Sequence, residues 1–371
     1  MSLLQQFQES MESVYGKISG VPDATKWTPP PKSGGHKGRY LWTDAFGVLN
    51  FLTLYKELSL RADNNAAANN SLIFAQRLIT TVHDVLGRTR DGRNRLPRAT
   101  DEEPLKGGLR IGKEEETGPD GDGQYFHYLT MWMFALNRMS IATGDPSYNR
   151  QAISLAKAVH PHFFLNRTSE RPHMVWKVAM DLSRPLVASE GNLDPIDGYV
   201  VFRLLQASAS KCGDGEVLKE EIADYKKVMA RKGDYFVTRD PLDLGMTLWT
   251  AHWFADREKW ARDLSSRCVS QLHRLFDENH FLETNLEFRL AFREFGTCLG
   301  IGCLPDGEAG NNAVGLGHRS EEIITQWQKY ISSTLTPDDL KPITKVMYST
   351  ALIPGAFKSR YWGDEPIESN P

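Results

Sequence analysis

The sequence contains two copies of one helix-start signal, and their spacing constrains the fold more than any other feature. Asp194 and Asp240 each place a capping carboxylate before a proline at the first helical position, and an apolar run follows each proline. Asp197 and Asp243 add a second acidic residue to each first turn. The two starts lie 240 − 194 = 46 residues apart. A repeated helix start at this spacing predicts a protein built from stacked helical hairpins.

Apolar patterning divides the chain into twelve predicted helices of two alternating kinds. Six amphipathic helices have one apolar stripe each and begin near residues 3, 71, 147, 216, 258 and 319. Six mostly apolar helices begin near residues 44, 124, 195, 241, 286 and 343. A helix without a polar face is a buried helix, whereas a one-sided helix covers it. The alternation predicts an all-α (α/α)6 toroid, a single domain over residues 1–371, with the apolar helices as its inner ring.

An open α-solenoid is the alternative architecture, because helix-pair repeats of about this length also build superhelices. Two features favour the toroid. The predicted repeats differ in length, and the apolar helices are rich in aromatic residues rather than in the small and aliphatic residues of stacked pairs. In a toroid the helices beginning at 195 and 241 are neighbours, with Asp194 and Asp240 at the same end.

Three long segments precede apolar helices in this arrangement. Residues 19–42, 88–123 and 164–193 each connect an outer helix to the start of an inner one. These connections therefore meet on one face of the ring, above the N-termini of the inner helices. Because long loops on a rigid scaffold concentrate binding and catalysis, we expect the functional site on this face.

Composition excludes several classes of partner. The net charge of −3 gives no reason to expect binding to nucleic acid or an anionic membrane. No apolar run reaches the roughly 18 residues of a spanning helix, and the N-terminus lacks the apolar core of a signal peptide. Four cysteines without C-x-x-C spacing predict neither a disulfide scaffold nor a zinc site. We expect a cytoplasmic protein that acts on a small molecule without a metal or cofactor; the sequence indicates no particular oligomeric state.

The twelve alternating helices, the chain length and the inner-helix starts resemble the six-hairpin glycosidase superfamily. That superfamily includes unsaturated uronyl hydrolases, and N-acylglucosamine 2-epimerases share the same toroid. The resemblance covers most of the chain and concerns its architecture, so no catalytic residue is carried over from it. It implies an enzyme that acts on carbohydrate.

Carboxylates at the inner-helix starts are the first candidates for chemistry. Asp44, Asp122, Asp197 and Asp243 occupy or approach first turns and would converge on one mouth of a toroid. Glycoside hydrolysis needs one carboxyl group that donates a proton and another that activates water or attacks. The alternative is that these residues only cap helices, which stabilises a helix by about 0.5–2 kcal/mol.

His127 is the histidine best placed to titrate usefully. It lies early in the second apolar helix, about one turn beyond Asp122. An epimerase or a lyase requires a base that removes a proton next to a carbonyl group, and His127 would supply it. The alternative is a core histidine whose hydrogen bonds are satisfied internally.

Arg289 and Arg293 are candidates for binding an anionic group of the substrate. They lie four residues apart in the predicted helix 286–300 and would therefore share one face. Glu294, next to Arg293 in the sequence, is a further candidate for substrate binding. Arginine receives carboxylate or phosphate through two parallel hydrogen bonds. The alternative is an internal ion-pair network with Glu287 or Glu294, because buried arginines are seldom unpaired.

Trp42 and Tyr125 stand near inner-helix starts, where aromatic rings can stack on sugars as well as pack. Together these features predict a glycoside-hydrolase-like enzyme for a sugar or sugar-like polar molecule, acidic if an arginine is free to bind it. An epimerase, isomerase or lyase is the second hypothesis. A non-catalytic helical scaffold that binds partners through its charged outer faces is the third.

Overall fold

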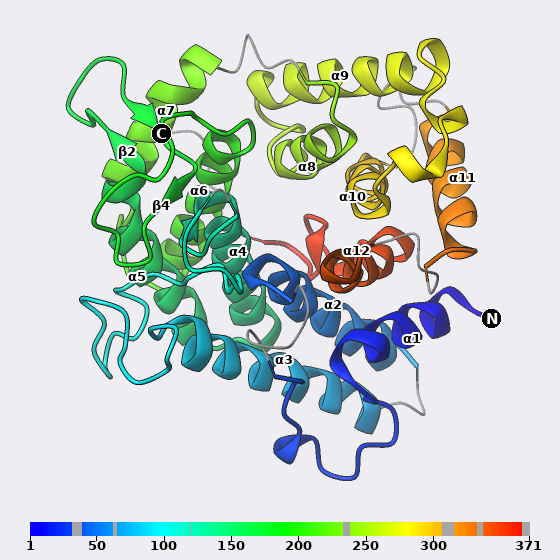
Figure 1. The fold of residues 1–371 in the computed structure, drawn as a ribbon, viewed down its shortest axis with the longest axis horizontal. Helices are drawn as coiled ribbons and strands as arrows, with labels where there is room; N and C mark the ends of the chain where they lie inside the picture. Colours follow the sequence, from blue (N-terminus) through cyan, green and yellow to red (C-terminus); the bar gives the residue numbers. More distant parts are fainter. Residues whose placement is uncertain are drawn as a thin grey trace.

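Twelve α-helices form two concentric layers (Figure 1) in the parts of the chain that the computed structural model describes, residues 1–31, 39–61, 65–118, 120–232, 238–305, 315–331 and 337–365. The inner helices are α2 (Leu41–Ser59), α4 (Phe126–Thr143), α6 (Asp194–Lys211), α8 (Pro241–Ala251), α10 (Ala291–Gly302) and α12 (Lys341–Leu352). The outer helices are α1 (Leu3–Tyr15), α3 (Asn65–Leu86), α5 (Pro146–Phe163), α7 (Lys219–Lys232), α9 (Lys259–His273) and α11 (Leu316–Gln328).

The inner helices close into a ring. Each one packs against the next from α2 to α12, and α12 packs against α2. Every outer helix packs on the inner helix of its own hairpin, with α1 against α12. The predicted all-α (α/α)6 toroid is therefore confirmed, and the contact between α12 and α2 excludes the open solenoid.

Burial explains why the two kinds of helix alternate. In α2, every residue from Leu41 to Leu54 is buried, whereas α3 buries one stripe that includes Phe74, Leu78 and Val82. Such burial of apolar side chains is the main stabilising contribution to a fold of this kind. Among the described residues, no helix is both long and apolar enough to cross a membrane.

Two predicted helix starts differ from the structure. Helix α3 begins at Asn65, six residues before the apolar stripe, because the alanine-rich run that follows Asn65 extends the helix without needing burial. Helix α10 begins at Ala291 rather than near 286, because the Asn285 side chain caps a separate 3-10 turn, Leu286–Phe288. Arg289 consequently lies in the connection before α10 and does not share a helical face with Arg293.

The two Asp-Pro starts are built differently. Asp240 is a true N-cap, since its carboxylate accepts a hydrogen bond of 3.1 Å from the backbone N–H of Asp243. The expected cap at Asp194 is wrong: Leu193 precedes α6 as its N-cap, and Asp194 is the first helical residue. The two starts nevertheless lie at the same end, because Asn192 donates a hydrogen bond of 2.9 Å to Asp243.

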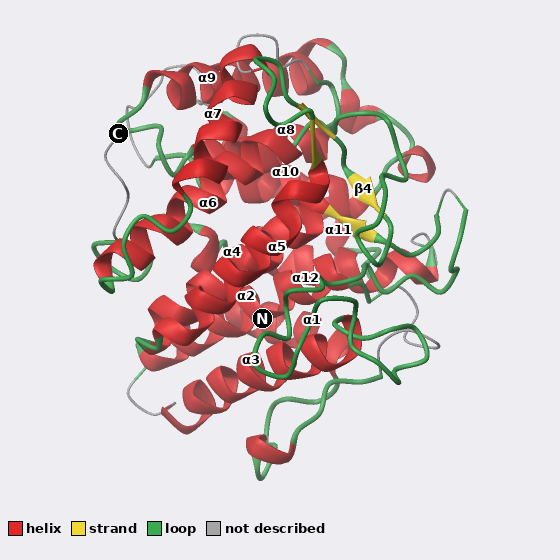
Figure 2. Cartoon of the chain, turned by 90° about the vertical axis from the view of Figure 1, so that its left-hand side faces the viewer, coloured by secondary structure: helices red, strands yellow, loops and turns green. Residues whose placement is uncertain are grey.

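The long segments meet over the inner-helix N-termini, as the sequence predicts. The backbone N–H of Leu41, the first residue of α2, donates to Ile111 of the 88–123 segment. Strand β1 (Gln124–Tyr125) pairs with β4 (Lys177–Val178) of the 164–193 segment, and β2 (Phe164–Leu165) pairs with β3 (His173–Met174), both antiparallel. Figure 2 shows these strands together at one side of the helices. Two loops thus share one face.

The C-terminal segment packs against the inner ring. Phe357, in the 3-10 turn Gly355–Phe357, lies among the rings of Phe46, Phe134 and Trp249. The indole N–H of Trp249 donates to the backbone carbonyl of Phe357 at 3.1 Å. This apolar cluster joins α2, α4 and α8 through a segment that follows the last helix.

A close contact between α8 and α10 depends on glycine. A Cβ atom added to Gly245 would lie 2.2 Å from the backbone oxygen of Gly296, which cannot move aside as a side chain can. We predict that Gly245→Ala lowers the free energy of unfolding by about 1–3 kcal/mol, the usual cost of overpacking. Gly317→Ala in α11 is the matched control, because no atom lies within 4 Å of the added Cβ. Urea unfolding of both variants measures the difference; equal stability would contradict the proposed contact.

Candidate active site

A hydrogen-bonded group of side chains from three inner helices lies at the centre of the candidate site. His127 of α4 places its Nδ1 2.7 Å from Oδ2 of Asp197 in α6. Thr250 of α8 donates its hydroxyl to the other oxygen, Oδ1, at 2.9 Å. Asp197 is buried, and both its oxygens are engaged. The packing of α4 against α6 therefore brings together two residues that the sequence predicts as candidates.

Asp197 determines how His127 can transfer a proton. A carboxylate only accepts hydrogen bonds, so Nδ1 of His127 carries the hydrogen, and Nε2 is the atom that gains or loses a proton. Nε2 is buried and has no hydrogen-bond partner in the described part of the chain. Burial favours the neutral ring, but the hydrogen bond and charge of Asp197, with the charges of Asp194 and Asp243, outweigh it and raise the pKa of His127.

Aromatic rings surround this histidine. Trp42 of α2 lies parallel to Tyr128, with ring centroids 5.7 Å apart and planes inclined by 10°, and its ring is 5.0 Å from His127. Tyr125 contacts Tyr128 edge to face at 5.0 Å and Trp176 at 4.8 Å. The two predicted sugar-stacking residues, Trp42 and Tyr125, thus belong to one cluster beside His127. Their contact with a sugar stays a prediction.

Asp243 is the most available of the predicted carboxylates. It is partly exposed, and Oδ2 accepts hydrogen bonds from Asn192 at 2.9 Å and from Thr238 at 3.3 Å. Within the described residues, Oδ1 accepts no hydrogen bond. Because Asp243 also contributes to the raised pKa of His127, its charge acts on the same site. A carboxylate with an oxygen open to other partners is a group that can take part in proton transfer.

Two other predicted carboxylates are engaged in structural contacts. Oδ1 of Asp44 lies 3.1 Å from the Arg39 guanidinium and accepts the Tyr15 hydroxyl at 3.0 Å, and all three side chains are buried. Asp122 receives Arg110 at 3.0 Å, Arg90 at 3.2 Å and three backbone N–H groups. These bonds fasten the start of α2 and the end of the 88–123 segment. A catalytic role for either residue stays a prediction, without a free oxygen in these contacts to support it.

The predicted arginines also have internal partners. Arg289 is buried and binds Glu294 through two parallel hydrogen bonds of 2.8 and 2.6 Å, and it also donates to Gln326. Arg293, which is more exposed, pairs with Asp240 at the start of α8. The internal ion pair considered for Glu294 is thus present. Any contact of Arg289 or Arg293 with a substrate would compete with these bonds.

Several residues of this region had no distinct signal in the sequence. Thr250 and Trp176 belong to ordinary-looking apolar and loop segments, and only the fold places them beside Asp197 and Tyr125. Asp339 precedes α12, and its charge contributes, after burial, to raising the pKa of Tyr40 at the start of α2 to about 12. In the described residues, no group of three or more His, Cys, Asp or Glu side chains is arranged to hold a metal ion.

Comparison with solved structures identifies the architecture. The chain is similar to the GH76A α-1,6-mannanase from Salegentibacter sp. HEL1_6, with a TM-score of 0.52 and 11% sequence identity, over 94% of this chain and 97% of that one. The same values hold for an inactive variant of that enzyme, with two consecutive aspartates replaced by asparagine, in complex with α-1,6-mannotriose. The chain has the (α/α)6 toroid fold of that enzyme. No family model matches the sequence, and no curated protein matches it.

Asp122 and Asp243 differ in burial and in their partners, so stability measurements can separate them. Asp122→Asn leaves the buried Arg110 without its counter-charge, and breaking such a pair costs about 3–5 kcal/mol. Asp243→Asn replaces a partly exposed group and should cost about 1 kcal/mol or less. We predict that urea unfolding shows a large loss for Asp122→Asn alone. A comparable loss for Asp243→Asn would assign that carboxylate to the structure instead of the site.

Proposed function

We propose that this protein is a glycoside hydrolase that cleaves a glycosidic bond at the inner-helix N-termini. The observation that supports this proposal most is the hydrogen bond of 2.7 Å between His127 and Asp197, with the ring of Trp42 5.0 Å from His127. Carbohydrate enzymes commonly combine acid and base groups with aromatic surfaces for the apolar faces of sugars. The mannanase of the same fold is in complex with an oligosaccharide.

In this proposal His127 and Asp243 divide the chemistry. The protonated His127, held by Asp197, donates the proton on Nε2 to the leaving oxygen. The ionised Asp243 takes a proton from the attacking water through Oδ1. Asp197 itself touches no substrate; it fixes the ring orientation and stabilises the imidazolium, as a carboxylate does in catalytic triads. Trp42 and Tyr125 provide the surface on which the sugar stacks.

An epimerase or isomerase is the second candidate, and the unpartnered Nε2 of His127 favours it. When the ring is neutral, Nδ1–H remains hydrogen-bonded to Asp197, and the lone pair on Nε2 can remove a proton from carbon. The His127–Asp197 pair would then act with a neutral imidazole, whereas the hydrolase requires a protonated one. Hydrolysis incorporates one oxygen from water into the product, whereas epimerisation exchanges a carbon-bound hydrogen with solvent. Mass spectrometry in H₂¹⁸O or D₂O therefore separates the two reactions.

Substitution of the two proposed proton-transfer groups tests the hydrolase. With a panel of oligosaccharides that includes α-1,6-mannotriose, we predict that Asp243→Asn and His127→Gln each lower kcat by about 10²–10⁴-fold, the usual contribution of general acid–base catalysis. Asp339→Asn is the control, since Asp338 and Asp339 are the one consecutive aspartate pair in this sequence. If Asp339→Asn loses activity and Asp243→Asn keeps it, the catalytic carboxylates are at the start of α12 and Asp243 is not one of them.

The pH profile distinguishes the roles of His127. As an acid, His127 is active when protonated, so kcat falls as the pH rises through its raised pKa. Asp197→Asn removes the main interaction that raises this pKa, and we predict that the falling limb moves to lower pH. A His127 that acts as a base gives a rising limb instead. The profile of kcat for the wild type and Asp197→Asn measures both. A falling limb that does not move would remove Asp197 from the mechanism.

The compartment is also a proposal. Cys212, Cys268, Cys298 and Cys303 are all unpaired, which is usual for proteins of a reducing compartment. We infer that the enzyme acts in the cytoplasm on a small saccharide.

A further inference from the structure

Two adjoining cavities lie along α9: the larger one is between α8 and α9, and the smaller one is at the C-terminal end of α9. Their volumes are about 280 and 200 Å³, and both are lined by Gln271 and Arg274. Thr238 and Leu244 line the larger cavity, and Arg239 lines the smaller one. The shared wall makes the two cavities neighbours.

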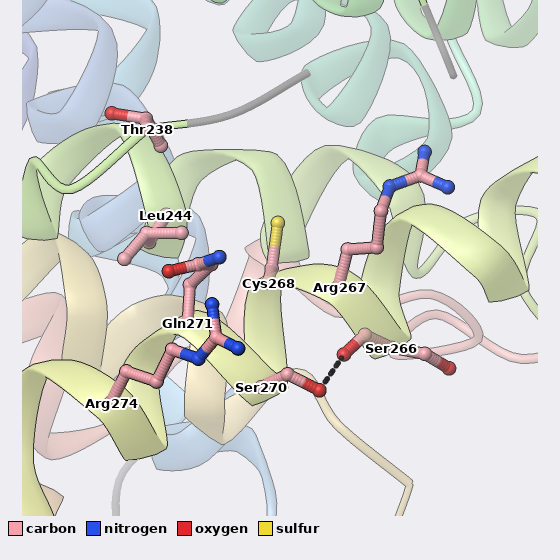
Figure 3. Close-up of a pocket in the computed structure, with 8 residues that line it drawn as sticks. All are labelled: Thr238, Leu244, Ser266, Arg267, Cys268, Ser270, Gln271 and Arg274. Atoms are coloured by element: carbon pink, nitrogen blue, oxygen red, sulfur yellow. Dashed lines mark hydrogen bonds between the residues drawn. The ribbon is translucent and has the colours of Figure 1, made fainter. Parts of the chain in front are cut away.

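The larger cavity is joined to the candidate site through Thr238. The Thr238 hydroxyl, on a residue that lines the cavity, donates to Oδ2 of Asp243 at 3.3 Å and accepts the backbone N–H of Asp240 at 3.1 Å. A ligand held against Thr238 is therefore one side chain away from the proposed catalytic carboxylate. Figure 3 shows Arg274 and Gln271 extending toward Leu244 and Thr238, while Arg267 extends away from them.

Arg239 and Arg274 are exposed arginines that line the smaller cavity. Neither side chain forms an ion pair or a hydrogen bond within the described part of the chain, in contrast to Arg289 and Arg293. One carboxylate, Glu278, lines the smaller cavity with them, so the positive charges outnumber the negative one. Guanidinium groups present their N–H donors in a planar fork that matches carboxylate and phosphate oxygens.

We propose that Arg239 and Arg274 form a subsite for an acidic sugar unit, one that bears a carboxylate or phosphate group. Gln271 and Thr238 offer neutral polar contacts for the hydroxyl groups of that unit. Bound there, the acidic unit places its neighbouring glycosidic bond toward Asp243. The substrate is then an anionic saccharide. This inference rests on the proposed function, because Asp243 defines the point of cleavage.

Direct binding measurements test the subsite without turnover. Isothermal titration at low ionic strength with D-glucuronate, glucose 6-phosphate and D-glucose should show binding of the two anionic sugars and none of glucose. Binding of glucuronate alone identifies a carboxylate subsite, and binding of the sugar phosphate alone identifies a phosphate subsite. Added salt should weaken the binding of either anionic sugar, because salt screens the interaction between exposed charges. Equal binding of glucose would overturn the proposal.

Arginine variants test whether the anionic sugar binds at Arg239 and Arg274. Arg274→Ala and Arg239→Ala should each raise the Kd of the bound anion about tenfold or more, the effect of losing hydrogen bonds to a charged group. Arg274→Lys should retain part of the affinity, because lysine keeps the positive charge as a point charge. Arg262→Ala, on the exposed part of α9, is the matched control and should bind as the wild type does. Identical Kd values for Arg274→Ala and Arg262→Ala would exclude the subsite.

The two proposals fail separately. Asp243→Asn should still bind the anionic sugar, because it leaves both arginines in place. Hydrolysis of neutral glycans that depends on Asp243, with no binding of anionic sugars, would overturn the acidic subsite and keep the hydrolase. Binding that depends on Arg274, with no hydrolysis of any glycan, would keep the subsite as an anion site and overturn the hydrolase.

Discussion

The contact between the last inner helix and the first holds the ring closed, and every other feature of the site depends on it. The Asn50 amide of α2 donates to the backbone carbonyl of Val346 in α12 at 2.9 Å, and Thr350 returns a hydrogen bond to the amide oxygen at 3.0 Å. A buried amide is costly without partners, so this pairing fixes one register between the two helices. Without closure the six inner-helix starts would not share one mouth.

Buried ion pairs then hold the connections over that mouth. Asp44 with Arg39 fastens the chain before α2, and Asp122 with Arg110 fastens the loop before α4. Asp44 and Asp122 are buried and paired with arginine, so these contacts hold the two connections in place. Trp42, His127, Asp197 and Asp243 lie at the starts of four inner helices, α2, α4, α6 and α8. The acidic residues at these starts therefore differ in burial and in partners, although their sequence positions are similar.

Much of the fold could be predicted from the sequence, and some details could not. Helices without a polar face have to be buried and one-sided helices have to cover them, which was sufficient to predict twelve helices and a closed ring. Helix starts were less certain: Asp194 begins α6 without capping it, and Arg289 precedes α10. Both depend on a few local hydrogen bonds, such as the cap made by Asn285, which compete closely in energy with continued helix.

The sequence by itself determined the alternation of inner and outer helices, and it predicted candidate acidic residues at the inner-helix starts. It did so because hydrophobic periodicity and helix-start chemistry are local. Only the tertiary structure decided that His127 meets Asp197, that Asp122 binds two arginines and three backbone amides, and that Arg289 binds Glu294. Which partner satisfies a buried charge depends on distances between residues far apart in the chain, and the packing of the closed ring sets those distances.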